Sequence, residues 1–377
     1  MSRFARAKDL VITHLGDIVP ELFGAGAKQT KRNARDGSFQ VANPWRHGSD
    51  LSQMKVWSTG AWKDFAGNQQ GDAMDLVAYG LVGVITHDTR MKALDWVENR
   101  YGLREMAPEA RKALEDQARA RRQKMEAEAA AETAGARRRT QKAFYAAQET
   151  IIGTEAEIYL RGRGIDAGLI PNRCPSFRFR PDCEYWPGRA GGVTPKFPGM
   201  MSAMLDANGR LGAVHYTFLE PDGSTKLKTL DRGWFDEKSD GRRVGLSAKL
   251  MFPDTHGLVI RVTRGPSNLT CEEAAGAGKA DWLLVTEGIE DAMTFALADD
   301  SLRVHAAGSL SGFLGVPDLP CAKGYLIARD NDWDKPQAVE QFDRALAHFR
   351  SFGKPVEEIA MPREWGKDAN DVLTRKE

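Results

Sequence analysis

The chain has 377 residues, too many for one ordinary domain, so two or three domains are expected. Its formal net charge of +1 excludes a global basic field, and any nucleic-acid contact must therefore come from local patches. No apolar run could span a membrane, and the N-terminus lacks a signal-peptide pattern, so we expect a soluble cytoplasmic protein. No C-x-x-C pair occurs, which predicts free thiols at Cys174, Cys183, Cys271 and Cys321.

Residues 1–103 are predicted to form a small, β-rich module. Apolar residues fall on one helical face over 8–23, and the Trp-, Gly- and Asn-rich stretch 38–77 indicates a small sheet. Two more helices are expected, around 72–81 and 88–100. A basic segment, which is either a solvated loop or a nucleic-acid contact, contains Lys28, Lys31, Arg32 and Arg35.

Residues 104–150 are rich in Ala, Glu, Arg and Lys, which predicts a long, exposed helix acting as a linker. Pro108 is placed to start this helix, and Gly135 interrupts the run. Residues 151–278 then predict a mixed α+β domain, with hairpin turns at Asn208-Gly209 and Asp222-Gly223. Its expected strands are 177–180, 203–206, 212–219 and 259–263.

Two basic pairs stand out in this middle domain. Lys226 and Lys228 follow a hairpin turn at alternate positions, so a strand there would direct both to one face. Arg178 and Arg180 alternate in the same way on another predicted strand. Such residues, facing a metal site, could hold the phosphates of a template and a nucleotide. The alternative is that they are solvated charges on the wet face of each strand.

The last part of the chain, residues 279–377, carries the strongest signal. Two apolar runs of strand length end in acids, one at Glu287 and the other at Asp330 and Asp332. The order β-α-β-β-α-β predicts helices on a mostly parallel sheet, hence an α/β fold within an α+β chain. Because sites in such sheets lie past the carboxyl ends of the strands, the three acids should converge. Carboxylates together suit a hard cation such as Mg²⁺.

Glu287-Gly288, Asp330-x-Asp332 and Gly366-Lys367-Asp368-x-Asn370-Asp371 together resemble the Toprim domain in its phage and plasmid primase form. The resemblance implies a Rossmann-like fold. Bacterial primases, type IA and II topoisomerases, recombination factors and some nucleases share this domain. The preceding 151–278 segment resembles the domain that forms one wall of the primase cleft.

The N-terminal module resembles the zinc ribbon of bacterial-type primases. The similarity covers Asn43-Pro44-Trp45-Arg46, Trp62 to Gly67, and Gly71 to Val77. The zinc-ligand positions, however, are occupied by residues that cannot make a tetrahedral zinc site, namely Asn43, Arg46, Asp64 and Gly67. We therefore expect no zinc. The module either contacts nucleic acid or serves only for packing.

Taken together, the resemblance implies a DNA primase of phage or plasmid type. It would make short RNA primers on a single-stranded DNA template from ribonucleoside triphosphates, by Mg²⁺- or Mn²⁺-dependent nucleotidyl transfer. A separate replicative helicase is a further candidate partner. Glu287, as metal ligand or general base, would act with Asp330 and Asp332, while Asp368 and Asp371 would add carboxylates to the metal site. The residues expected to bind nucleic acid or nucleotide are Arg178, Arg180, Lys226, Lys228 and Lys367.

Two alternatives remain from the sequence. A Toprim-type nuclease or strand-breaking enzyme would use the same acids, although no ATPase module and no identifiable tyrosine nucleophile accompany them. A non-catalytic protein that binds single-stranded DNA during replication is the third hypothesis, and the intact acids argue against it.

Overall fold

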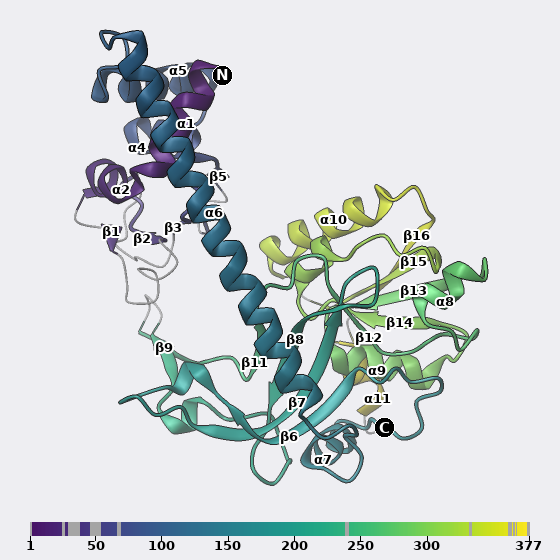
Figure 1. Cartoon of the computed structure of the whole chain (residues 1–377). Helices are drawn as coiled ribbons and strands as arrows, with labels where there is room; N and C mark the ends of the chain where they lie inside the picture. The colour runs from purple at the N-terminus through teal and green to yellow at the C-terminus, as the bar shows by residue number, and fades with distance from the viewer. Residues whose placement is uncertain are drawn as a thin grey trace. The chain divides into compact units, whose positions relative to one another are not determined.

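The computed structural model describes residues 2–24, 27–28, 38–45, 54–65, 69–237, 241–331, 334–360, 364, 366 and 368–374. Its contacts divide the chain into two compact units, Met1–Glu132 and Thr133–Glu377. Figure 1 shows the helices and strands in chain order. The mixed α and β content confirms the predicted fold class. Within the described residues, no helix is both long and apolar enough to cross a membrane.

The first unit packs helices against a five-stranded antiparallel sheet of order β1-β2-β3-β4-β5. The strands alternate buried and half-buried residues, as expected for a sheet with one face on a core. Asp72 begins α4 and Thr86 begins α5 with side-chain capping boxes. The elements are α1 (Arg3–Thr13), α2 (Leu15–Phe23), β1 (Ala27–Lys28), β2 (Phe39–Val41), β3 (Met54–Val56), β4 (Trp62–Asp64), β5 (Gln70–Gly71), α4 (Ala73–Val82) and α5 (His87–Arg100).

The predicted linker is one uninterrupted helix, α6 (Pro108–Tyr145), which continues through Gly135. Most of its side chains are exposed. Near its start Ala118 is buried in the core of the first unit, and near its end Phe144 is buried in the second. The boundary between the two units therefore falls inside a helix.

The second unit is built on one nine-stranded sheet of order β11-β8-β7-β12-β14-β13-β15-β16, with β6 also paired to β7. Strands β6 to β8, β11 and β12 pair antiparallel, whereas β14, β13, β15 and β16 are parallel. The antiparallel strands are β6 (Phe177–Glu184), β7 (Lys196–Leu205), β8 (Leu211–Phe218), β11 (Lys249–Phe252) and β12 (Val259–Arg261). The parallel strands are β13 (Asp281–Thr286), β14 (Arg303–Ala306), β15 (Ala322–Arg329) and β16 (Val356–Ala360).

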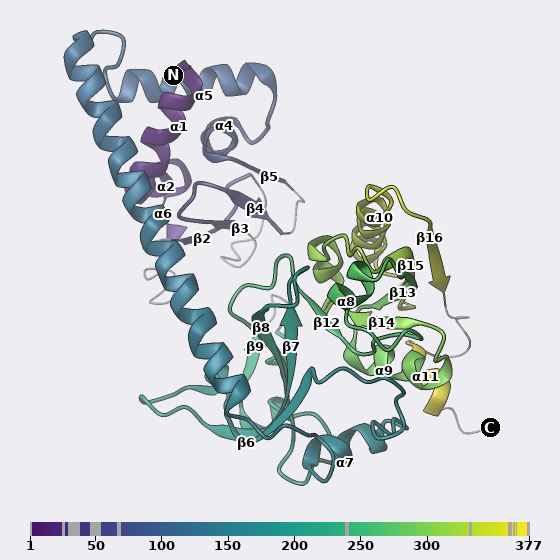
Figure 2. The ribbon, with the colours of Figure 1, turned by 45° about the vertical axis from the view of Figure 1, so that its right-hand side comes forward.

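The parallel part confirms the predicted β-α-β-β-α-β order. Helix α9 (Ile289–Ala298) covers one face of the sheet and α10 (Pro336–Arg350) the other, as Figure 2 shows. Successive residues of β13 serve both faces, because Leu284 packs with the α9 core and Leu283 with the α10 core. The remaining elements include α7 (Glu155–Gly162), β9 (Phe235–Glu237), β10 (Arg243–Gly245), α8 (Cys271–Gly276), the 3₁₀ helix η4 (Leu310–Gly315) and α11 (Ala369–Thr374).

Candidate active site

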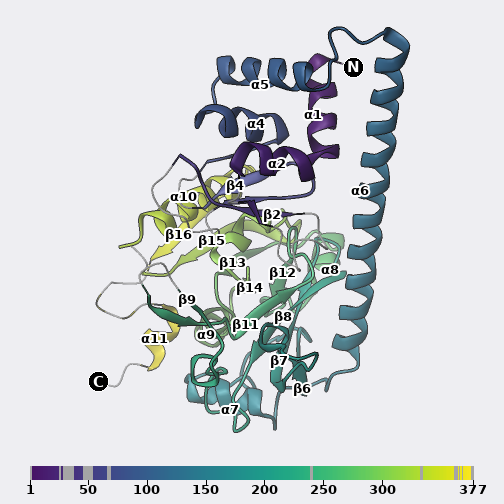
Figure 3. The ribbon, with the colours of Figure 1, turned by 90° about the vertical axis from the view of Figure 1, so that its left-hand side faces the viewer.

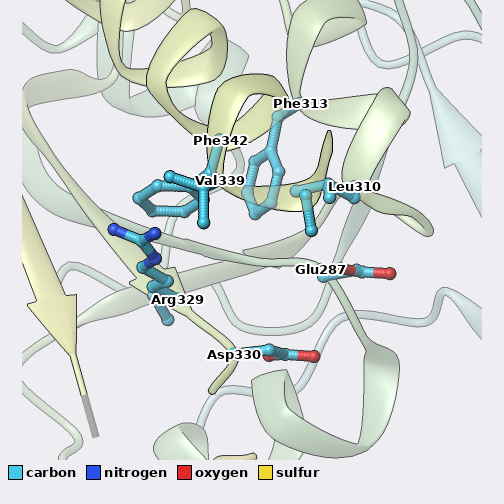
Figure 4. Close-up of a pocket in the computed structure, with 9 residues that line it drawn as sticks. Glu287, Leu310, Phe313, Arg329, Asp330, Val339 and Phe342 are labelled. Carbon is cyan, nitrogen blue, oxygen red and sulfur yellow. The ribbon is translucent and has the colours of Figure 1, made fainter. Parts of the chain in front are cut away.

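Glu287 and Asp330 lie side by side at the carboxyl edge of the parallel strands. Strand β13 ends at Thr286 and β15 at Arg329, and these two strands are paired neighbours. Both acids line one small pocket, and Figure 4 shows their carboxylates pointing to the same side, away from the apolar wall. That wall comes from η4 and α10 and includes Leu310, Phe313, Ala338, Val339 and Phe342.

Arg329, the last residue of β15, points away from the two carboxylates (Figure 4). Its guanidinium carbon lies 4.8 Å from the ring centroid of Phe342, and Nη1 lies 3.2 Å from Oε1 of Glu358. These contacts hold the arginine on the α10 side, so Asp330 and Glu287 share the other side of the pocket.

Asp291 joins this acidic edge because Gly288 leaves room for it. An ideal Cβ on Gly288 would lie 2.7 Å from Oδ2 of Asp291, closer than real Cβ contacts allow. Asp291 Oδ1 accepts a hydrogen bond of 3.0 Å from the backbone N–H of Asn370. Burial, and next the nearby carboxylate of Asp368, raise the pKa of Asp291 to about 6.

The predicted acids of the last segment lie at the same edge. Asn331, next to Asp330, donates through Nδ2 to the carbonyl of Gly366 at 2.6 Å. Asp368 then accepts from the backbone N–H of Asp371 at 2.9 Å. Gly366 has a φ of +133°, and a Cβ there would come within 2.5 Å of Cβ of Asp371, so glycine is needed for this turn.

Asp332 and Lys367 lie outside the described residues, so their predicted roles stay predictions. Among the residues that the structure does describe, no three His, Cys, Asp or Glu side chains are grouped as a metal site. The chemistry of the donors nevertheless fits Mg²⁺ or Mn²⁺, because Glu287 and Asp330 offer carboxylate oxygens from adjacent strands in one pocket.

A partly buried ion pair, which the sequence did not reveal, lies beside the acids. Lys249 Nζ is 2.8 Å from Oε2 of Glu290, and the Tyr159 hydroxyl donates to Oε1 at 2.6 Å. Burial opposes ionisation of Glu290, but Lys249 and Tyr159 outweigh it and hold its pKa well below the usual range. The only sequence signal was position, since Glu290 follows Glu287 by three residues and therefore falls in the first turn of α9.

Of the predicted lysine pair, only Lys226 faces this cluster. Lys226 is half-buried, and burial, then the neighbouring charge of Lys249, lower its pKa. Lys228 is exposed and its backbone N–H donates to Glu220. The predicted strand is wrong, because the pairing stops at an isolated bridge between Lys226 and Leu219. Leu227 still donates to the carbonyl of Phe218, but the N–H of Lys228 donates to the side chain of Glu220.

Arg178 and Arg180 do lie on a strand, β6, at alternate half-buried positions. Arg178 stacks on Phe144 and Tyr145 and donates to the backbone carbonyl of Tyr145. Arg180 pairs with Asp182 at 2.6 Å. Both guanidiniums thus contribute to packing and local ion pairing, and their binding of nucleic acid stays a prediction.

In the N-terminal unit, two of the four predicted ligand positions form a buried hydrogen-bond network. Asn43 Nδ2 donates to Oδ2 of Asp64 and to the hydroxyl of Tyr79, each at 2.8 Å. Asn43 and Asp64 are both almost fully buried. Arg46 and Gly67, the other two positions, lie outside the described residues. The expected lack of zinc stays a prediction.

Comparisons with known proteins give one family and several structures. Residues 134–261 match the model of a family described as a domain of unknown function, DUF7146. No curated protein matches the chain.

Several solved structures of primases are similar to this chain. A DNA primase domain from Pseudomonas aeruginosa is 16% identical, with 63% of this chain and 74% of that one covered and a TM-score of 0.39. The primase fragment of the bacteriophage T7 primase-helicase protein is 14% identical, with coverage of 57% and 68% and a TM-score of 0.33. The DnaG primase catalytic domain bound to ssDNA is 15% identical, with coverage of 65% and 76% and a TM-score of 0.37. Since these TM-scores lie below 0.5, the function must be inferred from the residues of the site.

Proposed function

We propose that the chain is a Toprim-type DNA primase of the phage or plasmid kind, which makes RNA primers on single-stranded DNA. The observation that carries the proposal is the pairing of Glu287 and Asp330 at the ends of β13 and β15, with both carboxylates on one side of one pocket. The motif around these acids resembles the Toprim domain, and the β-α-β-β-α-β order with parallel strands supports the proposal.

The acids and the cations beside them fit nucleotidyl transfer. Glu287 and Asp330 would hold Mg²⁺ or Mn²⁺, which when bound neutralises developing charge on the reacting phosphate. In the reaction the primer 3′ hydroxyl would attack the α-phosphorus of a ribonucleoside triphosphate, forming the new phosphodiester bond as the bond to the β-phosphate breaks and pyrophosphate leaves. A carboxylate at Glu287 is able either to ligate the cation or to accept the hydroxyl proton.

Positive side chains near the acids are suited to bind phosphates. Burial and the nearby charge of Lys249 lower the pKa of Lys226, and Arg163 Nη2 lies 3.9 Å from Oδ1 of Asp368. Lysine and arginine side chains hold phosphate oxygens through charge-assisted hydrogen bonds. The template and the incoming triphosphate are therefore the proposed ligands of this basic side, and a separate replicative helicase is a proposed partner.

The test is incorporation of labelled ribonucleotides on single-stranded DNA with Mg²⁺ or Mn²⁺, resolved on a gel. Asp330→Asn and Glu287→Gln should each lower synthesis by about a hundredfold or more, because each removes a charge that stabilises the transition state by several kcal/mol. Glu357→Gln, at an exposed acid of β16, is the matched control and should leave synthesis unchanged.

Two other results would point elsewhere. If both site variants kept normal incorporation, the acids would not be the active site. If the wild type shortened the DNA and made no primers, and the variants lost that activity, the strand-breaking alternative would replace the primase.

A further inference from the structure

The N-terminal unit contains a second pocket, lined mainly by cations. Helices α1 and α5 and the first turns of α6 lie side by side there, as Figures 2 and 3 show. The pocket has a volume of about 230 Å³, and its lining consists of Arg3, Arg6, Glu98, Leu103, Arg104 and Arg111. Four of these residues are arginines and one is an acid. Two further carboxylates lie just outside the lining, because Arg6 pairs with Glu115 at 3.3 Å and Arg104 also pairs with Asp95.

The single carboxylate is already shared. Glu98 accepts from Arg3 at 2.6 Å and from Arg104 at 3.0 Å. The hydrogen bond from Arg3 outweighs burial and, with Arg104, lowers the pKa of Glu98 to about 2, so this acid stays ionised. With Glu115 beside Arg6 and Asp95 beside Arg104, three carboxylates face the four guanidiniums. Arg111 is the one of the four without an acidic partner among the described residues.

Arg111 supplies an independent reason for an anion. Its Nη2 donates to the carbonyl of Met106 at 3.1 Å, but Nε is buried and has no hydrogen-bond partner among the described residues. A buried donor without an acceptor is unfavourable, and an external acceptor in the pocket would satisfy it. Helix α6 begins at Pro108, so the positive end of its dipole lies within a turn of Arg111.

We propose that this arginine pocket binds a phosphate group. Guanidinium forks match the geometry of phosphate oxygens, and a tetrahedral anion presents acceptors in several directions at once, as converging arginines require. The proposal involves only residues 3–111 of the first unit and holds whether or not the acids of the second unit catalyse primer synthesis.

Calorimetric titration of the full chain with pyrophosphate, at constant ionic strength and with EDTA, tests the site. EDTA removes the cations through which phosphates would bind at Glu287 and Asp330, so failure here is separate from failure of the proposed function. We expect binding to the wild type, weakened about tenfold or more in Arg111→Met because one charge-assisted hydrogen bond is removed.

Arg119→Met is the matched control, since Arg119 lies two turns further along α6, is exposed and does not line the pocket. It should bind pyrophosphate as the wild type does. Absence of binding to the wild type, or equal affinity of the Arg111 and Arg119 variants, would overturn the proposal.

Glu98→Gln gives a readout that a purely structural role would not produce. Removal of the competing carboxylate should tighten pyrophosphate binding although the loss of two ion pairs lowers the melting temperature. Unchanged or weaker binding would count against the pocket, and Arg104→Met, which should weaken binding like Arg111→Met, guards against a Glu98 variant that does not fold.

Competition with a short single-stranded oligodeoxynucleotide identifies the source of the phosphate. Displacement of pyrophosphate by the oligonucleotide would assign the pocket to the nucleic-acid backbone. Retention of pyrophosphate would assign it to a free phosphorylated molecule. Both results support a phosphate site.

Discussion

Glu290 and Asp291 are neighbours in the first turn of α9, yet their environments shift their pKa values in opposite directions. Both are buried, which disfavours ionisation. Glu290 contacts Lys249 and Tyr159, and its pKa falls; Asp291 has the carboxylate of Asp368 beside it, and its pKa rises to about 6. The side chain opposite each acid, rather than burial alone, decides which one carries a stable charge at neutral pH.

This difference makes the stability of the protein dependent on Asp291 and pH. The pKa of Asp291 is about 6 in the folded protein, above the ordinary 3.8, so the folded state binds this proton more tightly than the unfolded state. The free energy of unfolding is therefore higher at low pH and falls as pH rises from about 4 to 6. Asp291→Asn should therefore stabilise the metal-free protein by about 2–3 kcal/mol at pH 8 and have little effect near pH 4. Urea unfolding at both pH values measures this.

Asp343→Asn, at an exposed acid of α10, is the control for the general effect of removing a negative charge. The asparagine at 291 keeps an oxygen that can accept the N–H of Asn370, so the comparison isolates ionisation. A stabilisation that is equal at pH 4 and pH 8 would contradict the argument.

At the scale of elements, the N-terminal sheet is joined to α4 by polar side chains. Asn43 follows β2, Asp64 ends β4 and Tyr79 lies on α4, so one network links three elements. The ring of Trp62 lies 4.8 Å from that of Tyr79 and encloses the network. Hydrogen bonds here link elements that a metal ion would link in a zinc ribbon.

This network predicts independence from zinc. Chelators should leave the melting temperature unchanged, and elemental analysis should find no stoichiometric zinc. Asn43→Ala should lower stability by about 1–3 kcal/mol, because a buried carboxylate at Asp64 loses a donor. One tightly bound zinc per chain, or a neutral Asn43→Ala, would contradict the prediction.

Helix α6 gives a second prediction at this scale. Gly135 lies within the helix, and an added Cβ would meet only the flexible Nη1 of Arg139, at 3.4 Å. Gly135→Ala should therefore stabilise the protein by about 0.5–1 kcal/mol. Gly102 is equally open but has a φ of +59°, so Gly102→Ala should destabilise it. Thermal unfolding of both variants tests this prediction. It would be refuted if both substitutions shifted the melting temperature in the same direction.

Elements with strong local patterns could be predicted from the sequence, and contacts between distant segments could not. The apolar runs that become β13 and β15 end in Glu287 and Asp330, so both strands and their edge were predictable. The strand predicted after the Asp222-Gly223 turn does not form, because the N–H of Lys228 donates to the side chain of Glu220 and does not continue the backbone pairing. The Lys249–Glu290 pair joins residues 41 positions apart, and no periodicity marks it.

At the scale of the molecule, the near-neutral charge affects any DNA binding. With a net charge of +1, attraction to DNA must come from local cations, so affinity for single-stranded DNA should be weak and fall steeply with salt. Lys226→Ala with Lys249→Ala should reduce the slope of log affinity against log salt by roughly 0.7 for each phosphate that the protein no longer neutralises. Fluorescence anisotropy over a salt series measures the slope.

The control is Lys323→Ala, at an exposed lysine near the start of β15, the end away from Asp330. It should leave the slope unchanged. If the double variant kept the wild-type slope, the DNA would bind to another part of the chain.

The hydrogen bonds of Asn370 also determine when, during synthesis of the chain, the acidic edge can form. Its side chain donates to the carbonyl of Arg163, a residue 207 positions earlier, and its backbone N–H donates to Asp291. During translation the strands that carry Glu287 and Asp330 leave the ribosome before this residue does. The acidic edge therefore cannot reach its final arrangement on a nascent chain until residue 370 has emerged, so the candidate site is completed well after the strands that carry Glu287 and Asp330 have been made.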